Sequence, residues 1–248
     1  MRRKLVVGNW KMHGTTQSNA SLLQSVAAGV GQGADVAVCV PFPYLSQAQS
    51  LLQGTAVTWG AQDVSAHAQG AYTGEVCAAM LRDFACRYVI VGHSERRRQY
   101  GEDDTQVVAK VKVALAEGVS PIICVGETLE QRERKLTKMV LTQQLDAVLR
   151  GCGVEALAQS VLAYEPIWAI GTGSTATPEQ AQEAHALLRA RAATADVSVA
   201  AQLRILYGGS VKAANAEALF ACPDIDGGLV GGASLVAEEF LAIAAAAQ

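Results

Sequence analysis

The stretch Val161-Leu162-Ala163-Tyr164 runs directly into Glu165 and Pro166, so an apolar run ends in a carboxylate and a proline that disfavours helix. Other short apolar or β-branched runs recur along the 248 residues. They cover 5–7, 36–40, 57–59, 88–91, 122–125, 204–207 and 228–230. Each run is nearly continuous rather than alternating, which is typical of strands buried on both faces of a parallel sheet.

Stretches of helical character separate these runs. They lie at 17–30, 104–117, 129–150, 178–195 and 235–246, with less obvious ones at 76–84 and 212–220. Thr128 and Thr177 each stand three residues before a glutamine, as in a capping box, and Pro178 suits a first helical position. The alternation predicts an α/β fold, a closed (β/α)₈ barrel forming a single domain over 1–248. A doubly wound open sheet is the alternative from pattern alone.

Composition narrows the class of protein. The net charge is −3 and no basic face is implied, so we expect no nucleic-acid partner. The apolar run 5–7 is too short for a signal peptide, and no stretch approaches the ~18 apolar residues that span a membrane. The six cysteines form no metal or disulfide pattern, which favours reduced, buried thiols. We therefore expect a soluble, cytoplasmic protein.

Polar and glycine residues follow the predicted strands. They are Asn9 and Lys11 after the first strand, His93, Ser94 and Glu95 after the fourth, Glu165 after the sixth, Gly208, Gly209 and Ser210 after the seventh, and Gly231 and Gly232 after the eighth. Active sites of such barrels gather at the carboxyl ends of the strands. The sequence thus predicts one site at one mouth of the barrel.

A carboxylate and a histidine are the candidate acid–base groups. Glu165 lies in a partly dry position, where a raised pKa would suit a general base; a salt-bridged surface glutamate is the alternative. Ser94 is expected to cap the turn after His93, placing the ring beside a helix N-terminus that disfavours imidazolium. A purely structural histidine is the alternative there.

Lysine and glycine residues are the candidate anion-binding groups. Lys11 at the mouth could hold a phosphate and stabilise a developing negative charge, although most lysines are merely solvated. The glycine turns after the last two strands let backbone N–H groups approach a phosphate. The apolar residues of 166–176 indicate a lid that packs over the site, or else a loop packed statically on its own helix.

Seven blocks in order resemble the triosephosphate isomerase family along essentially the whole chain. The blocks are 8–12, 60–63, 91–97, 124–127, 163–173, 207–210 and 227–234. The resemblance implies a barrel that interconverts two triose phosphates in glycolysis and gluconeogenesis, with neither metal nor cofactor. Three departures from the family pattern are Ser174 at the lid tip, Asp63, and Val236 with Ala237 after Leu235.

The resemblance also implies roles for individual residues. Glu165 moves the proton between the two carbons, neutral His93 serves the two substrate oxygens, and Lys11 stabilises the enediolate. Cys124 is a buried support near the base. The residues implied to bind substrate are Asn9, Lys11, Glu95, Gly171, Ser210, Gly231 and Gly232.

The family is dimeric, and the stretch 63–75 resembles the arm that inserts into a second subunit with Thr73 near its tip. Two other functions remain open at this point. One is another phosphosugar barrel, an epimerase or isomerase, although the metal ligands of a metal-dependent epimerase are not found. The other is a non-catalytic barrel kept as a binding scaffold.

Overall fold

Eight parallel strands close into a barrel in the computed structural model, which describes residues 2–170 and 175–247. The strands are β1 Leu5–Asn9, β2 Asp35–Val40, β3 Val57–Ala61, β4 Tyr88–Val91, β5 Ser120–Val125, β6 Val161–Tyr164, β7 Arg204–Tyr207 and β8 Gly227–Val230. Each pairs with its neighbour in sequence, and β8 pairs with β1. All eight predicted strands are confirmed, and the open-sheet alternative is excluded because the sheet has no edge.

The continuous apolar runs are explained by two separate layers of core. One cluster is made only of strand residues, among them Leu5, Val7, Ile122 and Ala163, and fills the inside of the barrel. The alternate strand residues, such as Val6, join a larger cluster with the helices outside. Because both faces of a strand are buried, both sets of side chains have to be apolar.

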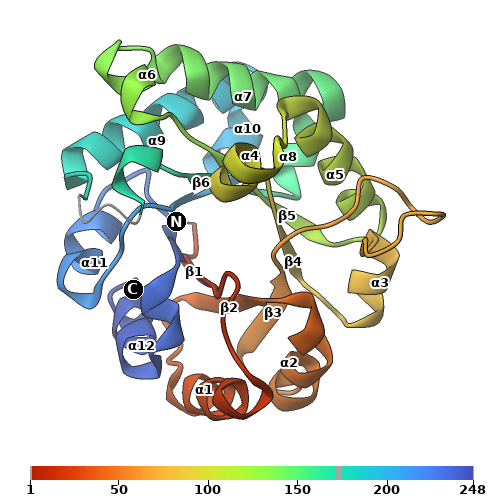
Figure 1. Cartoon of the computed structure of the whole chain (residues 1–248). Coiled ribbons are helices and arrows are strands. Elements are labelled where there is room, and N and C mark those ends of the chain that lie inside the picture. Colours follow the sequence, from red (N-terminus) through yellow and green to blue (C-terminus); the bar gives the residue numbers. More distant parts are fainter. Residues whose placement is uncertain (1, 171–174, 248) are drawn as a thin grey trace.

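Helices surround the barrel, and the longer ones follow one another around it in sequence order (Figure 1). They are α1 Thr16–Gly29, α2 Leu45–Leu52, α3 Ala78–Asp83, α4 Ser94–Tyr100, α5 Asp104–Ala116, α6 Leu129–Glu133, α7 Thr137–Cys152, α8 Val154–Ala158, α9 Pro178–Ala193, α10 Val197–Gln202, α11 Ala213–Phe220 and α12 Ala237–Ala245. Short 3₁₀ helices lie at η1 Phe42–Tyr44, η2 Ile167–Ala169 and η3 Gly232–Leu235. The capping boxes predicted at Thr128 and Thr177 are confirmed.

The helices that the sequence did not predict are short. α2, α4, α8 and α10 each span eight residues or fewer, too few turns for an apolar period to stand out. The predicted helix 129–150 is instead two helices, α6 and α7. The chain breaks there because Lys135 has a φ of 58°, a left-handed conformation that a helix cannot contain.

Replacing Lys135 by glycine is expected to raise the free energy of unfolding by up to about 1 kcal/mol, since glycine adopts φ > 0 without the Cβ penalty. Urea denaturation measures the change. The neighbouring Arg134→Gly is the matched control, because Arg134 has an ordinary φ of −79° and glycine should bring no gain there. Equal effects at both positions would contradict the assignment of strain to Lys135.

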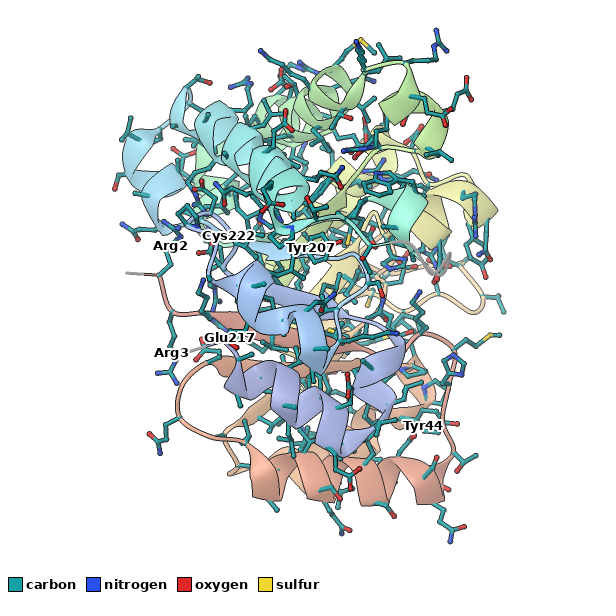
Figure 2. All side chains as sticks on the ribbon, turned by 90° about the vertical axis from the view of Figure 1, so that its left-hand side faces the viewer. Arg2, Arg3, Tyr44, Tyr207, Glu217 and Cys222 are labelled. Carbon is teal, nitrogen blue, oxygen red and sulfur yellow. The ribbon has the colours of Figure 1, made fainter. Side chains whose placement is uncertain are left out.

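The two ends of the barrel are separated in the side view of Figure 2. Arg2 and Arg3, which precede β1, lie at one end, and Tyr44, which follows β2, lies at the other. The second end is where the strands finish. Over the described ranges, no helix is both long and apolar enough to cross a membrane.

Candidate active site

The residues predicted from the strand ends converge on one cavity of about 290 Å³. Those that line it are Asn9, Lys11, His93, Glu165, Gly208, Gly209, Ser210, Gly231 and Gly232. Glu95 does not line the cavity but contacts Lys11 beside it. Gly171, also predicted to bind substrate, lies outside the described residues, as does Ser174. Lys212 lines the cavity and was not predicted, although it follows the Gly-Gly-Ser turn closely in sequence.

Glu165 stands directly after β6 and is only 2% exposed. Its Oε2 accepts a hydrogen bond from the Ser94 backbone N–H at 2.8 Å, and its Oε1 lies 2.9 Å from His93 Nε2. Burial raises the pKa of Glu165, but His93, the Ser94 amide and Lys11 together lower it by more. The predicted raised pKa is therefore wrong in this arrangement, because three positive or hydrogen-donating groups surround the carboxylate. Glu165 is held ionised.

His93 is the N-cap residue of α4, so the prediction that Ser94 caps this turn is wrong. The Glu95 backbone N–H donates to His93 Nδ1 at 3.2 Å. A neutral ring with its proton on Nε2 can accept from the Glu95 N–H at Nδ1 and donate from Nε2 to the Glu165 carboxylate. Burial lowers the pKa of His93, but the Glu165 and Glu95 carboxylates raise it by more. The backbone N–H at the start of α4 thus selects the tautomer with its proton on Nε2. The two nearby carboxylates raise the pKa of the ring.

Lys11 crosses the mouth from β1 towards α4. Its backbone N–H donates to Asn9 Oδ1 at 3.0 Å, and its φ of 52° turns the chain sharply after the strand. Its Nζ lies 2.5 Å from Glu95 Oε1. A Cβ on Gly231 would lie 3.3 Å from Lys11 Cε, so the stem passes close to the β8 turn. Glu95 thus holds the ammonium, while the stem of Lys11 runs past the β8 turn.

The glycine turns approach the site more closely than larger residues would allow. A Cβ on Gly208 would lie 2.9 Å from Glu165 Cγ, and one on Gly209 would lie 2.2 Å from the Tyr207 hydroxyl. Gly231 and Gly232 begin η3, whose first N–H groups are free of helical partners. Both turns line the cavity, and the turn after β7 lies directly against Glu165.

Glu127 is a buried carboxylate that the sequence placed only within a family block. It is 0% exposed and its Oε1 accepts from the Tyr164 hydroxyl at 3.1 Å and from Trp168 Nε1 at 3.0 Å. Arg132 pairs with the same oxygen at 3.3 Å and stacks over the Trp168 ring at 4.5 Å. Glu127 lies two residues after β5, so its place at a strand end could have marked it as a candidate residue from the sequence. The group anchors the segment that begins at η2.

A partly buried network of four charges includes Arg96 of α4. Asp63, at the base of the long connection between β3 and α3, pairs with Arg96 at 2.8 Å and Lys110 at 2.7 Å. Glu102 pairs with the same two cations and accepts from the Gly92 backbone N–H at 2.8 Å. The aspartate that departs from the family pattern is thus neutralised on both sides. The network holds the turn that carries His93.

A closed (β/α)₈ barrel whose strand-end cavity is lined by a buried carboxylate–histidine pair and two glycine turns has the architecture of a barrel enzyme. The family model described as triosephosphate isomerase matches residues 4–247. A triosephosphate isomerase of Thiobacillus denitrificans is 60% identical over 100% of this chain and 99% of its own length. The one from Dechloromonas aromatica is 60% identical over 100% of both chains, and that of Bordetella pertussis 59% identical over 99% and 98%. The chain belongs to the triosephosphate isomerase family.

Proposed function

We propose that this protein interconverts D-glyceraldehyde 3-phosphate and dihydroxyacetone phosphate through an enediolate, a step of glycolysis and gluconeogenesis, without metal or cofactor. The observation that carries the proposal is the contact of Glu165 with His93 at 2.9 Å, in a cavity that the glycine turns after β7 and β8 also line. Membership of the isomerase family supports the same reaction.

Glu165 is the proposed base. It takes a proton from the carbon next to the carbonyl and returns it to the neighbouring carbon, while His93 passes a hydroxyl proton from one substrate oxygen to the other. The two transfers balance the isomerisation without a co-reactant. In the geometry described, its carboxylate is bound to the Ser94 amide and to His93, which lower its pKa. Moving the carboxylate from these partners towards the substrate removes their lowering of the pKa, so burial, which raises the pKa, has the larger influence. The base thus becomes more basic on leaving its resting contacts.

His93 and Lys11 are proposed to act on the substrate oxygens. His93 Nε2 carries the proton that hydrogen-bonds the oxygens, while Glu95 N–H occupies Nδ1 and fixes the tautomer. Lys11 places a positive charge where the enediolate forms, and Glu95 holds its ammonium. Asn9 orients the backbone of Lys11 through its side-chain oxygen.

The phosphate is proposed to bind the turns after β7 and β8 through the backbone N–H groups of Ser210, Gly231 and Gly232. Gly171 joins them in the proposal on the family resemblance. Glycine at 231 and 232 allows an anion to reach the backbone, and the start of a helical turn favours negative charge.

A coupled assay of purified protein with both triose phosphates, after exhaustive chelation, tests this function. Conversion in both directions is expected. Activity that disappears with the chelator and returns with a divalent ion would overturn the cofactor-free mechanism. Failure to turn over either triose phosphate would favour another phosphosugar reaction or a binding scaffold.

The finer proposals are one domain over 1–248, a cytoplasmic location and a homodimer. Six free cysteines suit a reducing compartment.

The long connection 62–77 extends away from the barrel beside α3 (Figure 1). Within it the rings of His67 and Tyr72 stack with centroids 3.9 Å apart, which preorganises an exposed arm. A second copy of the chain is the proposed partner of this arm.

Thr73→Arg is expected to shift the protein from dimer to monomer, because a charged side chain at the arm tip has no place in a packed interface. Sedimentation velocity measures the change, and activity should fall with the dimer. Thr142→Arg on α7 is the control and should leave the dimer intact. A parent protein that sediments as a fully active monomer would contradict the proposal.

A further inference from the structure

The backbone around Glu165 rests on the turn that follows β5. The Glu165 N–H donates to Val125 O at 2.8 Å, and the Ile167 N–H donates to Glu127 O at 3.1 Å. Between these two bonds, a Cβ added to Gly126 would lie 1.8 Å from Glu165 O. The peptide of Gly126 is therefore in direct contact with the backbone of the proposed base.

Gly126 lies beyond the end of β5, so no strand ladder holds it. Its polar groups are taken instead by one side chain from α7. The Gly126 N–H donates to Gln144 Oε1 at 2.8 Å, and Gln144 Nε2 donates to Gly126 O at 3.2 Å. A primary amide supplies the acceptor and the donor together, which a carboxylate or an apolar chain cannot do.

α7 is a firm support for this contact. Its 16 residues bury Val140, Leu141, Leu145 and Val148 against the core. Gln144 lies next to Leu145 in this helix and is itself partly buried. Any shift of the Gly126 turn relative to α7 would break two hydrogen bonds at once and leave their groups poorly solvated.

We propose that Gln144 is a positioning residue for the base, acting on Glu165 through the Gly126 peptide; this rests on the proposed isomerase function. The two bonds fix the turn between Val125 and Glu127, and this turn fixes the backbone from which the Glu165 side chain extends. Small misplacements of a catalytic group cost large factors in rate, up to about 10²-fold for 1 Å.

Two substitutions test the proposal. Gln144→Met keeps the length of the side chain and removes both bonds, whereas Gln144→Glu keeps the acceptor and removes the donor. We expect each to lower kcat by about 10- to 100-fold. KM should stay within about twofold, because the proposed phosphate turns follow β7 and β8 rather than β5.

The control is Gln143→Met, the same change at the exposed glutamine one residue earlier in α7. It should leave kcat unaltered. All assays are run well below the measured Tm of each variant, so that unfolding does not imitate a catalytic defect. If Gln144→Met does not fold, the nearly isosteric Gln144→Glu carries the test.

A lowered Tm with kcat within twofold of the parent would show a structural role only and overturn the proposal. A rise in KM with unchanged kcat would overturn it as well. A parent protein without isomerase activity would refute the proposed function instead, so the two failures are distinguishable.

Discussion

Glu165→Gln is expected to lower kcat by at least about 10²–10⁴-fold, the usual contribution of a positioned general base. The amide keeps the shape of the side chain and has no basicity. Its oxygen can still accept from the Ser94 N–H, so the resting position survives. The measurement is steady-state kinetics in both directions of the reaction.

KM should change little in this variant, because the proposed phosphate turns follow β7 and β8, whereas Glu165 follows β6. Glu155→Gln, at an exposed position on α8, is the matched control and should behave like the parent. A kcat close to that of the parent would show that Glu165 is not the base. In that case the family resemblance would still hold, but the assignment of the proton transfer would be wrong.

Lys11→Met is expected to reduce kcat/KM by about 10²–10³-fold. This is the usual loss when one preorganised group that stabilises charge in the transition state is removed. The methionine keeps most of the stem that passes Gly231 and loses the ammonium. Glu95 would lose its partner, which is tolerable because its side chain is 34% exposed. The defect should therefore lie in the chemistry rather than in folding.

Thermal denaturation distinguishes a defect in chemistry from a defect in folding, since the Tm of the Lys11 variant should stay near that of the parent. Lys138→Met on α7 removes an equal charge at an exposed position and should leave kcat/KM intact. If both lysine variants lose activity equally, a general effect of net charge would be responsible and the role given to Lys11 would be refuted.

The strands and the gathering of site residues could be read from the sequence. Both faces of each strand are buried, so runs such as 161–164 are continuous and apolar. This pattern can be recognised in the sequence without knowing which strands pair. Residues that directly follow the runs, such as Lys11 and Glu165, must then meet at one mouth, because parallel strands all end on the same side. The capping boxes at Thr128 and Thr177 are equally local.

Only the tertiary structure decided the chemistry of the groups once gathered. The pKa of Glu165 depends on Ser94, 71 positions away in sequence, and on the adjacent His93, and these contacts reversed the direction of the shift expected from burial alone. The support of Gly126 by Gln144 spans 18 positions. The break between α6 and α7 could not be predicted either, because lysine favours helices and nothing in the local sequence indicates that Lys135 adopts a left-handed conformation. Local patterns report which faces are buried, whereas electrostatics and turn geometry depend on neighbours that folding alone brings together.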